Sequence, residues 1–286
     1  MVQTLIIVSK AGHPDLAVAK TLLQSIGFVS GSQLLKDQAM QFSGNSSHSQ
    51  VSTILQPLKI DWCLHETLLR PADILVCDMD STIIGQECID EMADLAGVGE
   101  AVQAITKAAM HGDLEFSHSL SERVEQLAGQ SKNILDECWN NRITINPGAK
   151  TLIATMNRLG AKTALVSGGF TWFAKRVAQA VGFSEYHANQ LEFDGCKLTG
   201  NVIGEVIDGV AKLGHLSRLS KGGKITCVIG DGANDLAMVK GANIGIAYHA
   251  KPILEQSANG IIRHTDLSTT LLFQGVLPKN WVFIEE

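Results

Sequence analysis

The chain has 286 residues, of which 45% are hydrophobic and 18% charged, the balance of a globular protein with a buried core. Its net charge of −6 excludes a general nucleic-acid-binding protein, because such a protein presents a basic face. No apolar run reaches the length of a membrane span, and we expect no signal peptide near residues 1–12. Six cysteines without a C-x-x-C pair favour reduced thiols, so we expect a cytoplasmic protein.

The first 70 residues are predicted to form a small N-terminal α+β domain. The local patterns predict a strand, a helix that ends at Gly27, a polar loop and a second strand, in the order 2–8, 15–27, 43–50 and 51–55. Arg70-Pro71 interrupts the pattern. We therefore place a boundary at 66–73, which divides the chain into domains 1–70 and 71–286.

From residue 74 onward, short apolar runs alternate with helical segments. The runs that predict buried strands are 74–77, 163–166, 225–229 and 244–248. The segments that predict helices are 148–159, 172–181, 211–219 and 235–240. This alternation predicts an α/β fold with a Rossmann-like, mostly parallel sheet. The interval 80–163 is too long for one crossover, and its residues 85–145 are predicted to form an inserted helical cap.

Polar groups follow three of these predicted strands. Asp78 and Asp80 follow the first, Ser167-Gly168-Gly169 the second, and the segment 230–235 (GDGAND) the third. Parallel strands bring their carboxyl ends to one edge of the sheet, where open α/β sheets bind ligands. Glycine-rich turns bind phosphate through backbone N–H groups, and carboxylates suit Mg²⁺. The sequence therefore predicts a metal-assisted phosphate site.

The order of these residues resembles that of the haloacid-dehalogenase-like phosphotransferases, which carry D-x-D-x-T, a Ser or Thr, a Lys and G-D-x-x-x-D. The matching residues are Asp78, Asp80, Thr82, Ser167, Lys212, Asp231 and Asp235. Longer segments are similar to the phosphoserine phosphatase branch, among them DMDSTIIGQECIDEMA and VIGDGANDLAMVKGANIGIAYHAKP. These motifs do not cover residues 1–65, for which the ACT-like domain of some bacterial members is the candidate.

The resemblance implies Mg²⁺-dependent hydrolysis of O-phospho-L-serine to L-serine and phosphate, the last step of serine biosynthesis. It implies that Asp78 is the nucleophile and forms an aspartyl phosphate, and that Asp80 is the general acid and base. Lys212 bridges the phosphate and the nucleophile. The implied metal ligands are Asp78, the backbone carbonyl of Asp80, and Asp231. Asp235 lies behind them and orients Lys212 or a metal-bound water.

The resemblance also implies how the substrate is held. Glu87 matches the ammonium group of phosphoserine, and Arg123 matches its carboxylate. Met110 and Phe116 close over the site and exclude water. The groups implied to bind phosphate are Ser167, Gly168, Gly169, Lys212 and Asn234.

Two other functions stay open at this point. One is another enzyme of the same fold, either a phosphatase for a different small ester or a phosphomutase. The other is a non-catalytic amino-acid sensor that uses residues 1–65. The expected partner is the small-molecule substrate, without nucleic acid or membrane, and the sequence leaves open a homodimer and feedback by serine.

Overall fold

The computed structural model describes residues 2–66, 69–110 and 115–285. Its N-terminal part consists of β1 (Gln3–Val8), α1 (Asp15–Ser25), β2 (Val29–Leu35), β3 (Ala39–Gly44), α2 (His48–Leu55) and β4 (Asp61–His65). These strands pair antiparallel in the order β2-β3-β1-β4. The β-α-β-β-α-β order is that of ferredoxin-like domains.

The predicted strand at 51–55 is wrong, because these residues belong to helix α2. A capping box starts the helix inside the segment 43–50, which was predicted to be a loop. The Ser47 hydroxyl accepts a hydrogen bond from the Gln50 N–H (3.2 Å), and the Gln50 side chain accepts one from the Ser47 N–H (3.1 Å). Val51 and Leu55, four residues apart, are buried on one face of the helix.

The second part of the chain has the predicted α/β architecture. Parallel strands pair in the order β11-β10-β9-β5-β6-β7. The strands are β5 (Ile74–Cys77), β6 (Lys162–Phe170), β7 (Glu185–Asp194), β9 (Thr226–Gly230), β10 (Ile244–Tyr248) and β11 (Gly260–Ile262). The helices among them are α7 (Ala149–Arg158), α8 (Thr171–Val181), α9 (Gly209–Leu219), α10 (Leu236–Gly241), α11 (Pro252–Glu255) and α12 (Thr269–Phe273).

Strand β6 is longer than its apolar run. We predicted its end at residue 166, but it continues through Ser167-Gly168-Gly169 to Phe170. Its pairing with β7 is irregular between Val166 and Phe170. The glycine segment is therefore an irregular stretch of strand rather than a turn.

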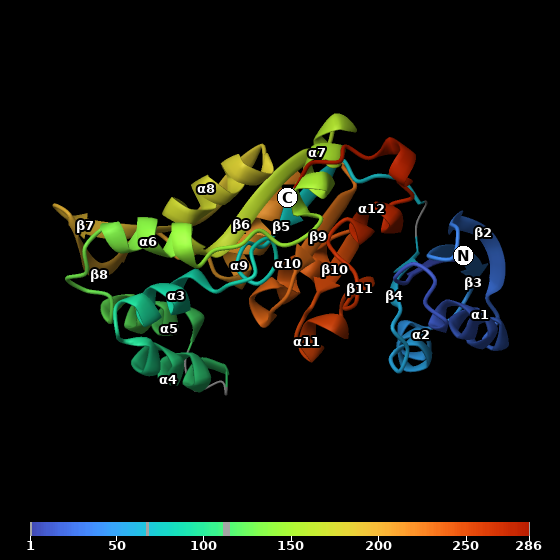
Figure 1. Cartoon of the computed structure of the whole chain (residues 1–286), viewed down its shortest axis with the longest axis horizontal. Helices are drawn as coiled ribbons and strands as arrows, with labels where there is room; N and C mark the ends of the chain where they lie inside the picture. The colour runs from blue at the N-terminus through green and yellow to red at the C-terminus, as the bar shows by residue number, and fades with distance from the viewer. Residues whose placement is uncertain (1, 67–68, 111–114, 286) are drawn as a thin grey trace.

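The described residues of the segment predicted to be a cap, which precedes α7, form four helices. They are α3 (Cys88–Leu95), α4 (Gly99–Met110), α5 (Phe116–Glu125) and α6 (Asn133–Asn141). A strand that was not predicted, β8 (Lys197–Ile203), forms a hairpin with β7 and packs beside these helices (Figure 1). Backbone hydrogen bonds join it to the segment after α5, from Gly129 N–H to Leu198 O (2.8 Å) and from Leu198 N–H to Gln130 O (2.9 Å).

The N-terminal strands continue the central sheet. Strand β4 pairs antiparallel with β11, with Trp62 opposite Ile261 and Cys63 opposite Gly260, so one sheet of 11 strands spans both parts. Figure 1 shows the N-terminal elements at one end of the molecule and the helices α3–α6 at the other. A domain boundary at residues 70/71 therefore stays a prediction, and it would cut across a continuous sheet.

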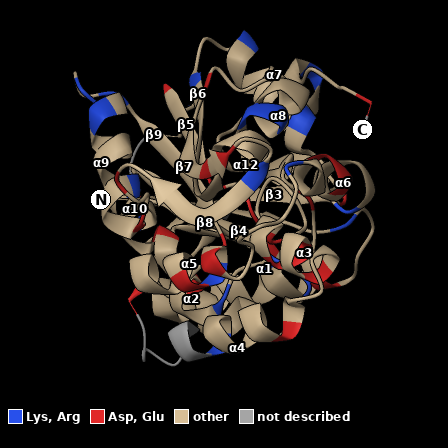
Figure 2. Ribbon diagram, turned by 90° about the vertical axis from the view of Figure 1, so that its left-hand side faces the viewer, with Lys and Arg blue, Asp and Glu red and all other residues tan. Residues whose placement is uncertain are grey.

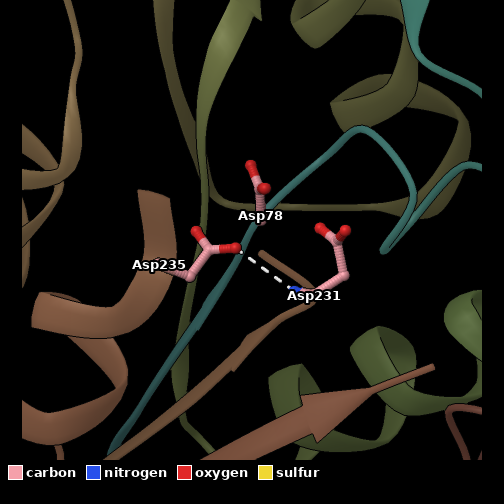
Figure 3. Close-up of side chains that lie close together, drawn as sticks. All are labelled: Asp78, Asp231 and Asp235. Carbon is pink, nitrogen blue, oxygen red and sulfur yellow. Dashed lines mark hydrogen bonds between the residues drawn. The ribbon is translucent and has the colours of Figure 1, made fainter. Parts of the chain in front are cut away.

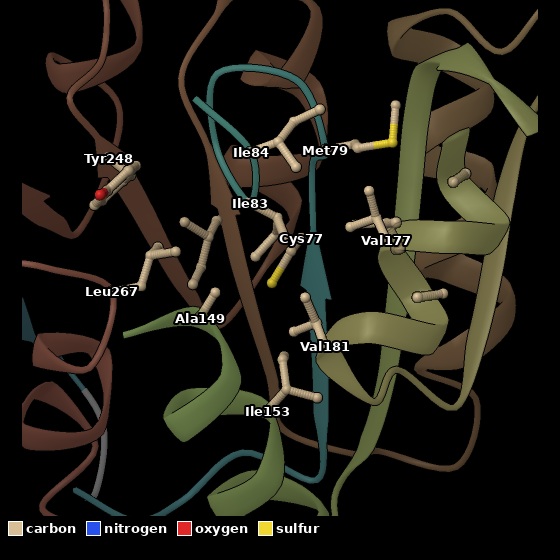
Figure 4. Packing of buried hydrophobic residues seen from close by; sticks show 14 of the residues in the cluster. Cys77, Met79, Ile83, Ile84, Ala149, Ile153, Val177, Val181, Tyr248 and Leu267 are labelled. Carbon is tan, nitrogen blue, oxygen red and sulfur yellow. The ribbon is translucent and has the colours of Figure 1, made fainter. Parts of the chain in front are cut away.

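The core beneath β5 holds the end of this strand in place. Figure 4 shows Cys77 and Met79 among residues of α7 and α8, such as Ile153 and Val177. All four side chains are fully buried in one cluster. Asp78 lies between Cys77 and Met79, so this packing fixes the backbone that carries its carboxylate. In the described ranges, no helix is long and apolar enough to span a membrane.

Asp61 ties β4 to the segment after β11. Its fully buried carboxylate accepts hydrogen bonds from the backbone N–H groups of Arg263 (2.7 Å), His264 (3.0 Å) and Thr265 (2.9 Å). We expect Asp61→Ala to lower the free energy of unfolding by about 3 kcal/mol, because three partly buried backbone donors lose their acceptor. Urea denaturation measures this change.

The control is Asp15→Ala, whose partly exposed carboxylate accepts one bond from the Lys59 N–H (2.7 Å) and lies 3.7 Å from His13 Nδ1. This variant is expected to lose about 1 kcal/mol. Equal losses in the two variants would show that the Asp61 contacts do not join the N-terminal strands to the rest of the sheet.

Candidate active site

Three carboxylates converge where strands β5 and β9 end. Asp78 follows β5, Asp231 follows β9, and Asp235 closes the short 3₁₀ turn Ala233–Asp235 that leads into α10. Each offers an oxygen, and these oxygens lie within 4.8 Å of one another (Figure 3). The parallel sheet thus brings together residues that are about 150 positions apart in the chain, as the strand-end pattern predicts.

Lys212 enters this cluster from helix α9. Its side chain is fully buried, and its Nζ lies 2.7 Å from Asp78 Oδ1 and 2.7 Å from Asp235 Oδ1. Burial disfavours the ammonium form, but the two carboxylates outweigh burial and raise the pKa of Lys212. Lys212 therefore stays charged and holds the Asp78 carboxylate in one orientation.

Asp235 uses both of its oxygens within the protein. One accepts the bond from Lys212, and the other accepts bonds from the backbone N–H groups of Asp231 (3.2 Å) and Gly232 (3.3 Å). Figure 3 shows the bond to the Asp231 backbone, with the Asp231 side chain directed away from Asp235. Asp235 is thus placed to hold the Asp231 loop and Lys212 in position.

The cluster carries more negative than positive charge. Burial and the charges of Asp235 and Asp231 raise the pKa of Asp78 well above its usual value, although Lys212 opposes the shift. Burial and the charge of Asp235 raise the pKa of Asp231 to about 7. Three carboxylates beside one ammonium form a site that could bind a metal ion, and their oxygen atoms suit a hard divalent cation.

Asp80 lies beside the cluster in a second hydrogen-bond network. Its Oδ1 accepts a bond from the Cys88 N–H (2.9 Å) at the start of α3, and its Oδ2 accepts one from the Ser167 hydroxyl (3.2 Å). Burial, followed by the charge of Glu87, raises the pKa of Asp80 to about 6. A carboxyl group with this pKa can both give and take a proton near neutral pH.

The glycines after Ser167 allow the chain to pass close to these groups. A Cβ atom at Gly169 would collide with Asp80 Oδ2, so a side chain is excluded there. A Cβ atom at Gly168 would lie 2.8 Å from the Phe116 ring, which places this aromatic residue of α5 directly over the strand. The structure thus brings Phe116, Gly168, Gly169 and Asp80 together.

Glu87 and Arg123 lie on the cap side of Asp80. Glu87 precedes α3, and its carboxylate accepts a bond from the Ser81 hydroxyl (2.7 Å). Arg123 of α5 is partly buried; burial lowers its pKa, while the charges of Asp90, Glu87 and Asp80 raise it. Figure 2 shows acidic residues, coloured red, along the ribbons of α3 and α5. Arg123 is therefore a cation in an acidic setting near Asp80.

For two predicted substrate-binding residues, Met110 and Asn234, the structure gives the position in the chain but no contact that tests the predicted role. Met110 is the last residue of α4, but its side chain lies outside the described residues. Asn234 lies in the turn between Asp231 and Asp235, and its amide oxygen is 2.5 Å from the position of a Cβ at Gly232. Contact of either side chain with substrate stays a prediction.

The structure gives contacts within the site to two groups for which the sequence predicted no role. The buried Thr82 hydroxyl donates to Asp231 Oδ1 (3.4 Å), and the Cys88 N–H supports Asp80. Thr82 was part of the D-x-D-x-T pattern, which was the signal that pointed to it. The Cys88 contact had no such signal, because it depends on where α3 begins relative to β5.

The fold and the site define a haloacid dehalogenase-like hydrolase. The model of the family described as haloacid dehalogenase-like hydrolase matches residues 75–240, and the chain belongs to this family. The chain is 46% identical over 199 residues to a phosphoserine phosphatase of Idiomarina loihiensis, and the alignment covers 68% of this chain and 90% of that protein. The predicted resemblance to this branch of the family is thereby confirmed.

Solved structures agree with this assignment. A HAD family hydrolase of Salmonella enterica serovar Typhi superposes with a TM-score of 0.84 at 25% identity, over 96% of this chain and 98% of that one. A substrate-bound phosphoserine phosphatase superposes with a TM-score of 0.66 at 38% identity, over 71% of this chain and 98% of that one. The first likeness therefore extends over the N-terminal part as well.

Proposed function

We propose that the chain is a cytoplasmic phosphoric monoester hydrolase that converts O-phospho-L-serine to L-serine and phosphate. The observation that carries this proposal is the buried Asp78–Lys212 pair with Asp80 beside it. It is supported by 37–46% identity to phosphoserine phosphatases of several organisms. The reaction is the last step of serine biosynthesis.

Asp78 is proposed to attack the phosphorus atom and to become an aspartyl phosphate as the serine oxygen leaves. The Lys212 ammonium offsets the repulsion between two anions, the Asp78 carboxylate and the phosphate group. It also keeps the attacking carboxylate oriented. Asp80 gives its proton to the departing serine oxygen and then takes a proton from the water that cleaves the aspartyl phosphate. Its pKa of about 6 suits both tasks.

The proposed cofactor is Mg²⁺, held by the carboxylates of Asp78 and Asp231 and by the backbone carbonyl of Asp80. The excess negative charge of the cluster and its oxygen donors fit this ion. Bound Mg²⁺ neutralises charge on the phosphoryl oxygens and on the carboxylates. Both Asp235 oxygens already accept hydrogen bonds, which supports its proposed place behind the ligands.

Removal of divalent metal is expected to stop phosphate release, and added Mg²⁺ to restore it. Ca²⁺ is expected to inhibit, because it takes more ligands in looser geometry and disturbs the attack by Asp78. The measurements are phosphate release after chelation and the Mg²⁺-dependent rise in melting temperature. Asp231→Asn is expected to weaken both responses. Full activity in excess chelator would refute the role of the metal.

The cap is proposed to select phosphoserine. Glu87 receives the ammonium group, Arg123 receives the carboxylate, and the Phe116 ring over Gly168 closes the phosphate site. Ser167, Gly168, Gly169, Lys212 and Asn234 are proposed to bind the phosphate group. The charge of Glu87 raises the pKa of Asp80, and the charge of Asp80 acts to raise the pKa of Arg123, which supports a common position beside the reacting group.

Arg123→Ala tests this assignment of substrate. We expect kcat/KM for phosphoserine to fall about 10- to 150-fold, since charge-assisted hydrogen bonds to the carboxylate are lost. Hydrolysis of an aryl phosphate, which has no carboxylate, is expected to change little. The control is Arg142→Ala, which removes another cap arginine that pairs with Asp94 (3.1 Å) and Glu91 (3.7 Å).

A loss of equal size on both substrates would make Arg123 a structural or phosphate-binding residue, and the assignment of phosphoserine would lose its support. Preferential turnover of another ester by the unmodified chain would favour a different phosphatase of this family.

Residues 1–70 are proposed to form an ACT-like domain, which their β-α-β-β-α-β order supports.

A further inference from the structure

Asn189 of strand β7 joins two segments that border the active site. Its side chain is buried, with 2% exposure. The amide nitrogen donates to the Gly168 carbonyl oxygen (2.8 Å), and the amide oxygen accepts a bond from the Ile207 N–H (2.8 Å). Both partners fix the orientation of the amide, because one requires a donor and the other an acceptor.

The first contact leads to Asp80 through a single peptide unit. In a planar trans peptide, the carbonyl of Gly168 and the N–H of Gly169 point in opposite directions. The carbonyl is held by Asn189, and the N–H donates to the Ser167 hydroxyl oxygen (2.8 Å). That hydroxyl in turn donates to Asp80 Oδ2 (3.2 Å).

This peptide needs an external support. It joins two glycines, whose backbones rotate more freely than those of other residues. It also lies in the irregular stretch of β6, where the register with β7 shifts between Val166 and Phe170. The Asn189 amide, which comes from β7 itself, therefore supplies a contact that the strand ladder lacks there.

The second contact leads to Lys212. Ile207 precedes Asp208, the N-cap of α9, whose side chain accepts a bond from the Ala211 N–H (2.8 Å). The Asp208 carbonyl accepts the first helical bond from the Lys212 N–H (2.9 Å). Asn189 thus links the start of the helix that carries Lys212 to the strand that carries Ser167.

We propose that Asn189 is a positioning residue for the phosphatase reaction, acting on Asp80 through the Gly168–Gly169 peptide and the Ser167 hydroxyl. The inference rests on the proposed function, since it assigns Asn189 to the same site. Asn189 touches neither the three clustered carboxylates nor Lys212 in the described contacts, so its effect passes through the groups that it holds.

The test is Asn189→Asp, which keeps the acceptor for Ile207 but places a carboxylate oxygen against the Gly168 carbonyl. We expect kcat for phosphoserine to fall about 10- to 100-fold, because small displacements of catalytic groups have effects of this size. KM is expected to change less than about threefold. Asn189→Ala is measured in the same way, in case the aspartate variant does not fold.

The matched control is Asn157→Asp on helix α7, whose side chain contacts Thr163 at the opposite end of β6. Asn157 makes the same kind of bridge, donating to the Gly182 carbonyl (2.7 Å) and accepting from the Thr163 hydroxyl (2.9 Å). It is expected to lower the melting temperature while changing kcat less than about threefold. An equal loss of kcat in both variants would reduce Asn189 to a structural residue.

A double-mutant cycle with Ser167→Ala identifies the route. If Asn189 acts through Ser167, Asn189→Asp is expected to lower kcat less than about threefold further once that hydroxyl is gone. Fully additive losses would overturn the proposed route. If the unmodified chain does not hydrolyse phosphoserine, the proposed function fails, and the cycle is read on a phosphate monoester that the chain does hydrolyse.

Discussion

Asp78→Asn is expected to abolish phosphate release from every phosphate ester while leaving the fold intact. An amide oxygen is a poor nucleophile, so no covalent intermediate forms. The substitution is isosteric, and Lys212 keeps its bond to Asp235 (2.7 Å). Steady-state phosphate release and the melting temperature are the measurements. A partial loss of phosphate release would not be compatible with a carboxylate that itself attacks phosphorus.

The control for this variant is Asp136→Asn, which changes a carboxylate on α6 that pairs at the surface with Arg176 (3.1 Å). It is expected to retain normal turnover, because an exposed ion pair contributes little. Substantial activity in purified Asp78→Asn, with contamination by the host phosphatases excluded, would refute the covalent mechanism.

Asp80→Asn is expected to lower kcat for phosphoserine about 10²- to 10⁴-fold, the usual contribution of a positioned general acid or base. Both steps are affected, because the same carboxyl group gives a proton in the first and takes one in the second. The amide oxygen can still accept the bond from the Cys88 N–H, and the amide nitrogen can donate to the Ser167 hydroxyl oxygen, so both neighbours keep a partner although the second bond is reversed.

A substrate with a good leaving group separates the two roles of Asp80. An aryl phosphate needs little protonation of its leaving oxygen, so formation of the aspartyl phosphate is expected to be nearly normal and its hydrolysis slow. Pre-steady-state release of the aryl alcohol would then show a burst in Asp80→Asn. The control is Asp90→Asn, a neighbouring carboxyl group of α3. Equal losses in the two variants would contradict a proton-transfer role.

The regular part of the fold could be predicted because its signals are local. The strands at 74–77, 225–229 and 244–248 are short apolar runs buried on both faces, and the structure places strands there. Other elements have no such signal. The β7–β8 hairpin is only partly buried, so its residues lack a continuous apolar run. Helix α2 was mistaken for a strand because its first turn is polar and its apolar residues are few.

By itself, the sequence determined the parallel α/β core, the order of the motif residues and the edge of the sheet where they meet. These follow from apolar runs and from the types of residue at their ends, which the chain encodes over short distances. Only the tertiary structure decided that Lys212 lies 2.7 Å from both Asp78 and Asp235, that Asn189 supports the Gly168 peptide, and that β4 extends the sheet. Such contacts join residues far apart in the chain, and their geometry is set by how whole strands and helices pack, which no local pattern specifies.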